Sequence, residues 1–92
     1  MTPNEILSQV SDVTGVPVEI ILGKNRTERV SEARFMAAWL MREMLFLTFA
    51  QIGAALSRSD HSSAMHCYSR ANHLRETNQQ FREKSDNIKE RV

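Results

Sequence analysis

The chain has 92 residues, which is enough for one hydrophobic core but not for two, so we expect residues 1–92 to form a single domain. Its 12 basic and 11 acidic side chains nearly balance, so the composition alone does not indicate nucleic-acid binding. No apolar run approaches the roughly 20 residues of a membrane span, and the N-terminal residues lack a secretory pattern. The single cysteine, Cys67, excludes an internal disulfide and fits a reducing compartment, which predicts a cytoplasmic protein.

The charges are distributed unevenly along the chain. Residues 1–22 carry three acidic side chains and no basic one, whereas residues 23–58 carry six basic side chains against three acidic ones. A phosphate-binding face is therefore expected in the central part of the chain, and it would place the protein at the nucleoid.

The first quarter of the sequence predicts two helices. Thr2-Pro3-Asn4-Glu5 is a capping box with proline at the first helical position, which favours a helix over residues 3–14. Gly15 ends this helix. A second, short helix is expected to start at Val16-Pro17 and to stop at Gly23.

A basic, turn-prone connection at residues 24–27 leads into the longest predicted helix, over about residues 28–45. Residues 35–41 are apolar on every face, as expected for the central and most buried helix of a bundle, with Trp39 in the core. The nearby side chains predicted to pack in the core rather than to form a partner surface are Met36, Met41, Met44 and Phe46.

The stretch over residues 47–70 has the outline of a helix-turn-helix. A capping box, Thr48-x-x-Gln51, opens a helix in which Gly53 predicts the close approach of a second helix backbone. Ser57-Arg58-Ser59 is the break, after which Ser59 or Asp60 caps the next helix. Side chains expected to face inward from there on are Ala64, Cys67, Tyr68, Ala71 and Leu74, followed by Phe81, Ile88 and Val92 on a last helix capped by Thr77-Asn78.

The first turn of the helix after the break carries several hydrogen-bonding side chains. Asp60, His61, Ser62 and Ser63 stand where a helix lying in the major groove presents its residues to base edges. A carboxylate can accept a hydrogen bond from a cytosine amino group, and histidine and serine can contact other base edges. The alternative is that Asp60 and Ser62 only cap a helix of an all-α domain, and the pattern alone leaves both interpretations open.

Three segments resemble the C-terminal DNA-binding domain of the bacterial DnaA replication initiators. They are Arg34-Phe35-Met36-Ala37-Ala38-Trp39-Leu40, Ile52-Gly53 and Asp60-His61-Ser62-Ser63. The resemblance covers about residues 5–92. It implies an all-α, compact bundle of five to six helices containing a helix-turn-helix, here standing alone. It also implies sequence-specific binding of double-stranded DNA, as in replication-origin recognition or its regulation.

The resemblance also implies roles for individual residues. Asp60, His61 and Ser62 match base contacts in the major groove, and Arg26 matches an arginine that enters the adjacent minor groove. Ala50 stands where the family often has a proline that touches a base. The predicted phosphate contacts are Lys24, Arg34, Arg42, Thr48, Ser63 and Arg70.

The sequence departs from the family pattern at the turn and in the reading helix. Ser57-Arg58-Ser59 stands where the family has Gly-Gly-Arg or similar, which affects the turn and the placement of its arginine. Ser62 lacks the methyl group that a threonine would place against a thymine, and Trp39 replaces a common tyrosine. The preferred DNA site can therefore differ from the usual initiator box.

Other chemistry finds little support in the sequence. His66, Cys67 and His73 lack a fourth ligand at suitable spacing, and His66 is expected to be a half-buried packing residue. No catalytic set and no glycine-rich phosphate loop is present, so we predict no enzymatic activity, metal, cofactor or nucleotide. The expected partner is a short, asymmetric, A·T-containing DNA box bound by a monomer, without membrane contact. The alternative is a helical protein-interaction module that retains the fold without DNA binding.

Overall fold

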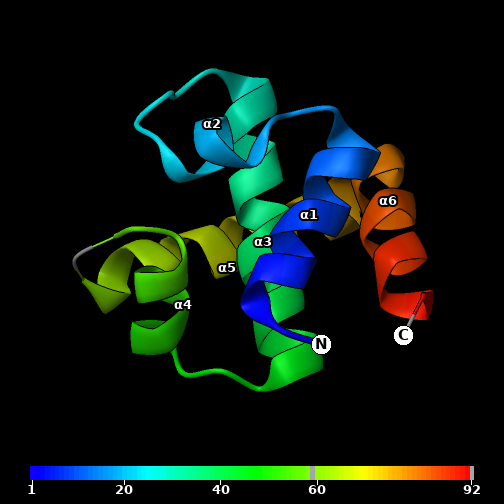
Figure 1. The fold of residues 1–92 in the computed structure, drawn as a ribbon. Helices are drawn as coiled ribbons and strands as arrows, with labels where there is room; N and C mark the ends of the chain where they lie inside the picture. The colour runs from blue at the N-terminus through cyan, green and yellow to red at the C-terminus, as the bar shows by residue number, and fades with distance from the viewer. Residues whose placement is uncertain (59, 92) are drawn as a thin grey trace.

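The computed structural model describes residues 1–58 and 60–91, and over these residues the chain forms six helices and no strand (Figure 1). This confirms the prediction of an all-α fold. The helices are α1 (Pro3–Thr14), α2 (Val18–Leu22), α3 (Glu28–Leu45), α4 (Phe49–Ala55), α5 (His61–Thr77) and α6 (Gln79–Glu90).

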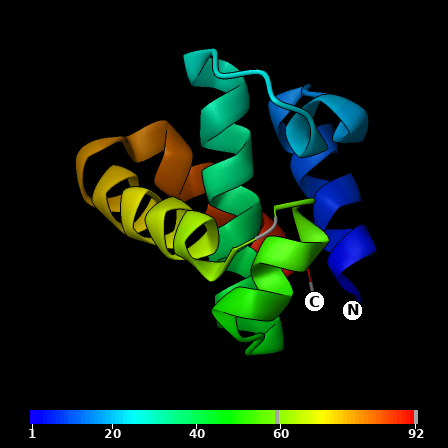
Figure 2. The ribbon, with the colours of Figure 1, turned by 90° about the vertical axis from the view of Figure 1, so that its left-hand side faces the viewer.

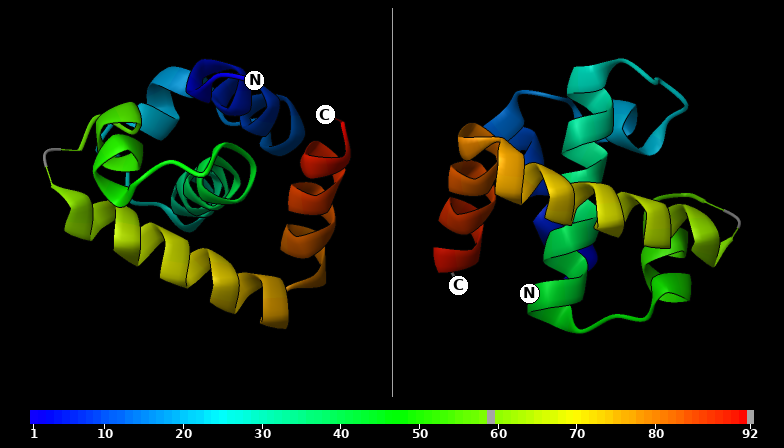
Figure 3. Two further views of the ribbon diagram at one scale, coloured as in Figure 1. Left: turned by 90° about the horizontal axis from the view of Figure 1, so that it is seen from below. Right: turned by 180° about the vertical axis from the view of Figure 1, so that it is seen from behind.

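Helix α3 lies at the centre of the molecule and contacts each of the five other helices (Figure 3). Residues 36–41 are all buried, as their apolar pattern predicted. Trp39 is only 4% exposed, its indole N–H donates to Oδ1 of Asn72 at 3.2 Å, and the Arg75 guanidinium lies 4.0 Å from the ring centroid. The tryptophan therefore joins α3 to α5 and has its one polar atom satisfied.

The helix starts follow the predicted caps. The side chain of Thr2 accepts from the Glu5 amide, and that of Asn78 accepts from the Phe81 amide. The short second helix was predicted to start at Val16-Pro17. In the structure Pro17 is its N-cap, and the helix begins at Val18. Phe81 and Ile88 are buried on α6 as predicted, whereas Val92 lies outside the described residues.

The prediction of a core position is wrong for Phe46. This residue follows α3 with φ of 55° and is 82% exposed, because the left-handed backbone that ends the helix directs the side chain into solvent. Met36 and Met41 are buried as predicted, and Met44 is half-buried. None of the described helices is both long enough and apolar enough to cross a membrane.

Candidate nucleic-acid interface

Helices α4 and α5 pack against each other as the two helices of a helix-turn-helix (Figure 2). A β-carbon built on Gly53 would lie 2.9 Å from the carbonyl oxygen of Asp60, closer than real β-carbons approach such an atom. The prediction that glycine permits a close backbone approach is therefore confirmed, and the partner is the backbone at the start of α5.

The turn after α4 adopts a left-handed conformation at Ser57, whose φ is 60°. The Ser57 amide donates to the carbonyl of Ala54 at 3.1 Å, and the Arg58 amide donates to that of Gly53 at 2.7 Å. Glycine adopts this conformation more easily than serine, which explains the glycine of the family pattern at this position. Ser59, the other predicted cap of α5, lies outside the described residues.

Asp60 caps α5, as one of the two predicted candidates. Its Oδ1 accepts a hydrogen bond from the Ser63 amide at 2.9 Å, and this bond holds the pKa of the carboxyl below its ordinary value. Asp60, His61 and Ser62 are all exposed. Capping is thus established for Asp60, and it leaves the side chain at the surface, where a base edge could also reach it.

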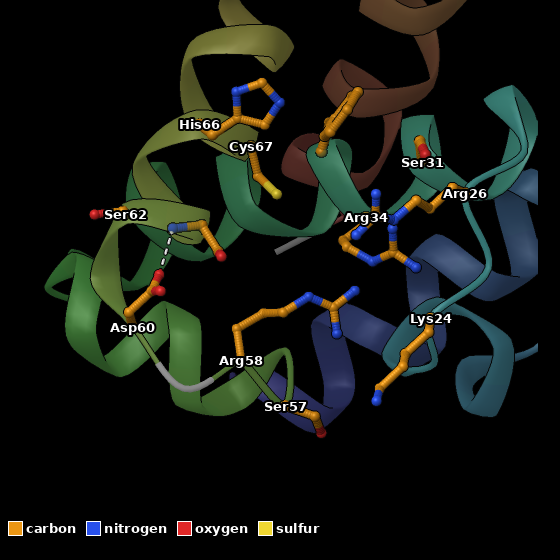
Figure 4. Close-up of a pocket in the computed structure, with 12 residues that line it drawn as sticks. Lys24, Arg26, Ser31, Arg34, Ser57, Arg58, Asp60, Ser62, His66 and Cys67 are labelled. Atoms are coloured by element: carbon orange, nitrogen blue, oxygen red, sulfur yellow. Dashed lines mark hydrogen bonds between the residues drawn. The ribbon is translucent and has the colours of Figure 1, made fainter.

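A hollow of about 860 Å³ separates the first turn of α5 from the loop between α2 and α3, which we call the basic loop (residues 23–27). Figure 4 shows that its lining side chains come from the loop, from α3, from the turn and from α5. Asp60 is the one acidic side chain among the described lining residues, which include four cations, Lys24, Arg26, Arg34 and Arg58. The hollow is therefore suited to anions.

Lys24 and Arg26 are exposed on the basic loop, but Arg34 is only 6% exposed. The Arg34 Nε donates to the carbonyl of Ile21 at 2.9 Å, and Nη2 donates to those of Gly23 and Asn25, each at 3.1 Å. Burial lowers the pKa of Arg34, and the neighbouring Arg58 lowers it further. Arg34 thus stabilises the loop, and its contact with a DNA phosphate stays a prediction.

Arg58 was not predicted as a site residue. Its Nη1 donates to the carbonyls of Leu22, at 3.3 Å, and Leu56, at 3.2 Å, and its Nη2 donates to that of Gly23 at 3.0 Å. The one signal in the sequence was an arginine where the family pattern has a glycine. That signal marks the residue as unusual, but it does not reveal the carbonyls that the side chain reaches.

The remaining predicted contacts lie outside the lining of the hollow. Thr48 forms both halves of its capping box with Gln51, as predicted, and Ala50 is exposed beside it on the first turn of α4. Arg42 donates to the carbonyl of Leu47 at 2.8 Å and lies 4.6 Å from the centroid of the Phe49 ring. Arg70 is exposed on α5, and the DNA contacts of all these residues stay predictions.

Two side chains of the hollow bear on the metal prediction. His66 is exposed rather than half-buried, because it lies at the rim, with its ring 6.0 Å from that of Phe35 in an edge-on contact. Cys67 is buried, which raises the pKa of its thiol and disfavours the thiolate that binds metals. Among the described residues, no group of three or more histidine, cysteine or acidic side chains could hold a metal ion.

Comparison with known families decides what this arrangement belongs to. Residues 3–70 match the family described as the bacterial DnaA protein helix-turn-helix. The chain belongs to this family. The matched residues include the basic loop, α3, α4 and the first part of α5, and therefore every residue predicted above to contact DNA.

Chromosomal replication initiator proteins named DnaA are similar to the chain over most of its length. The protein from a Picosynechococcus species is 30% identical over 90 residues, which are 98% of this chain and 20% of the relative. That from Streptococcus pyogenes serotype M1 is 31% identical over 88 residues, or 96% of this chain and 20% of the relative. That from Cutibacterium acnes is 32% identical over 66 residues, or 72% of this chain and 13% of the relative. The chain thus spans between about an eighth and a fifth of the length of these DnaA relatives.

Proposed function

We propose that this DnaA-family chain binds double-stranded DNA sequence-specifically, in replication-origin recognition or in its regulation. The observations that carry the proposal are the exposure of Asp60, His61 and Ser62 at the start of α5 and the cationic hollow that Asp60 lines together with the exposed Arg26. A helix end of this kind reads the major groove, and a loop arginine beside it can enter the adjacent minor groove. Family membership supports the same assignment.

The proposed DNA contacts divide into those to bases and those to phosphates. Asp60, His61, Ser62 and Ala50 contact base edges, with the Asp60 carboxylate accepting from a cytosine amino group. Arg26 prefers a narrow, A·T-rich minor groove, whose negative potential attracts a guanidinium. The phosphate contacts come from Lys24, Arg34, Arg42, Thr48, Ser63 and Arg70.

The proposed partner is a short, asymmetric, A·T-containing box bound by one copy of the chain in the cytoplasm, at the nucleoid. The major-groove and minor-groove contacts lie in one chain and differ from each other, so a monomer on an asymmetric site satisfies them. A titration of labelled duplex at concentrations above the dissociation constant measures the stoichiometry. A ratio of one chain to one box supports the proposal, and a ratio of two to one contradicts it.

The deciding experiment is selection from random duplexes, followed by measurement of affinity for the selected and for scrambled sequences. The selected box is then placed beside either an A·T or a G·C flank. Arg26→Ala should lose most affinity on the A·T-flanked duplex and little on the G·C-flanked one. Equal losses would make Arg26 a phosphate contact, and no enrichment in the selection would overturn sequence-specific binding.

A second candidate function is favoured by Phe46, which is 82% exposed in a left-handed backbone conformation that an aromatic residue rarely adopts. A helical protein-interaction module could use this exposed side chain as a contact. A salt-dependent shift of labelled duplex separates the two functions. Phe46→Ala should leave DNA affinity unchanged if DNA is the partner.

A further inference from the structure

Arg58 joins two parts of the proposed interface that lie far apart in the sequence. Its backbone belongs to the turn between α4 and α5, while its guanidinium donates to the carbonyls of Leu22 and Gly23 at the end of α2. A third bond, to the carbonyl of Leu56, holds the side chain against its own turn. The side chain therefore links the helix-turn-helix to the start of the basic loop (Figure 4).

The carbonyl of Gly23 receives a second hydrogen bond, from Arg34 on α3, at 3.1 Å. Arg34 also binds the carbonyl of Asn25 in the middle of the loop. The basic loop is therefore held from two sides, by α3 through Arg34 and by the turn through Arg58. Among the hydrogen bonds of the described residues, only those from Arg58 join the loop directly to the turn that precedes α5.

The basic loop needs these hydrogen bonds because it has little stabilising structure of its own. Helix α2 has five residues and no side-chain cap, and a helix this short is unstable without tertiary contacts. Residues 24–27 are exposed, so none of their own side chains anchors the loop in the core. The position of Arg26 is therefore determined mainly by what holds the backbone before and after it.

We infer that Arg58 is a positioning residue that fixes the spacing between Arg26 and the first turn of α5, and so the spacing between the minor-groove and major-groove contacts. This inference rests on the proposed function. Arginine suits the role because its planar fork presents several donors at fixed angles, so that one side chain satisfies three carbonyls. A lysine would place a single ammonium group there and could not reproduce the geometry.

The first test needs no DNA. Backbone ¹⁵N relaxation is measured for residues 24–27 in the wild type, Arg58→Ala and Arg58→Lys, with Arg82→Ala on the exposed face of α6 as the matched control. We expect order parameters in the loop to fall below about 0.6 in Arg58→Ala, to fall less in Arg58→Lys, and to stay unchanged in the control. A loop of unchanged order in Arg58→Ala would overturn the inference, and thermal unfolding of each variant confirms that it is folded.

The second test measures spacing on DNA. The A·T flank is moved by one base pair relative to the selected box, and affinities for both registers are compared. The wild type should prefer the correct register by roughly fivefold or more, and Arg58→Ala should lose most of this preference. The double variant Arg26→Ala, Arg58→Ala should show no further loss of preference beyond Arg26→Ala alone, because Arg58 acts through Arg26.

The outcomes separate the two proposals. If the wild type prefers the correct register and Arg58→Ala keeps that preference, the positioning role fails while the proposed function stands. If Arg58→Ala weakens all duplexes alike, Arg58 is a phosphate contact and the inference also fails. If the wild type shows no register preference, the minor-groove role of Arg26 fails, and the relaxation measurement then decides whether Arg58 holds the loop.

Discussion

Gly53 on α4 and Asp60 at the start of α5 are so close that a β-carbon on Gly53 would lie 2.9 Å from the Asp60 carbonyl oxygen. Helices α4 and α5 thus meet backbone to backbone at the N-cap residue of α5. A side chain at position 53 would push directly on the element that is proposed to enter the major groove.

Gly53→Ala is therefore expected to destabilise the protein by about 1–2 kcal/mol. Helix propensity alone predicts the opposite, a gain of about 1 kcal/mol, because alanine is the better helix former. Chemical denaturation measures the difference. Ala54→Gly, at the exposed neighbouring position on α4, provides the control and should lose about 1 kcal/mol from propensity alone. A stabilised Gly53→Ala variant would show that the two backbones can separate without cost.

Ser57→Gly is expected to stabilise the protein by about 0.5–1 kcal/mol. Ser57 has φ of 60°, where a side chain is disfavoured by about 1–2 kcal/mol, and this gain is partly offset by the greater entropy of glycine in the unfolded chain. Ser69→Gly, at an exposed position inside α5, should instead lose roughly 0.5 kcal/mol. Thermal unfolding of both variants tests the contrast, and equal shifts would contradict it.

Local signals predicted much of this fold. The Thr48 capping box, the caps at Thr2 and Asn78 and the close approach at Gly53 each depend on a few neighbouring residues, and the structure confirms them. The apolar run at residues 35–41 predicted the central helix in the same local way. Apolar side chains on every face of a helix indicate a helix surrounded by others.

The contacts of Arg34 and Arg58 could not be predicted in this way. Their acceptors are main-chain carbonyls, which every residue carries, and they come together only when α2, α3 and the turn have packed. Phe46 was assigned to the core on hydrophobicity, whereas its exposure follows from the backbone conformation that ends α3. Placement of polar and terminal side chains therefore depends on tertiary structure that periodicity does not reveal.

The capping and reading roles of Asp60 can be separated with Asp60→Asn. An asparagine side-chain oxygen also accepts from the Ser63 amide, so the cap and the stability of α5 should be retained. The second carboxylate oxygen becomes an amide donor, which cannot accept from cytosine. We expect a loss of about 1–3 kcal/mol of binding free energy on the selected box and little change on random duplex. Equal losses on both duplexes would leave Asp60 with the capping role alone.

The stability that the Asp60 cap contributes should depend on pH, in a direction that follows from the pKa shift. The Ser63 amide lowers the pKa of the Asp60 carboxyl, so the cap stabilises the fold above the ordinary pKa of aspartate. This contribution should be lost as the pH falls through the lowered pKa. Amide hydrogen exchange at Ser63, followed towards acid pH in the wild type and in Asp60→Asn, measures the effect. The wild type should lose protection on acidification, whereas the asparagine variant, which does not titrate, should lose none through its cap.

Binding should weaken with salt to a moderate degree. The proposed phosphate contacts are few, so a plot of log affinity against log salt should have a slope of order −4 to −6. Arg70→Ala removes one exposed cation from α5 and should make the slope shallower by about one. Arg82→Ala, on α6, should leave it unchanged. Affinity that barely differs between low and physiological salt would rule out this mode of binding.

Arg34→Met is expected to lower the free energy of unfolding by about 2–3 kcal/mol, because the carbonyls of Ile21, Gly23 and Asn25 lose a charged donor. Methionine retains most of the apolar volume, so the loss reports on the hydrogen bonds rather than on a cavity. Arg82→Met, at an exposed position, should change stability by less than about 0.5 kcal/mol.

DNA affinity of the folded Arg34→Met variant then distinguishes its two roles. If the guanidinium also reaches a phosphate, affinity should fall about equally on the selected box and on random duplex. If Arg34 acts only by holding the basic loop, the loss should be confined to the box with the A·T flank, which depends on Arg26. Both measurements require temperatures well below the variant's unfolding midpoint, and circular dichroism at the binding temperature verifies this. Unchanged stability in Arg34→Met would contradict the structural role assigned to its three hydrogen bonds.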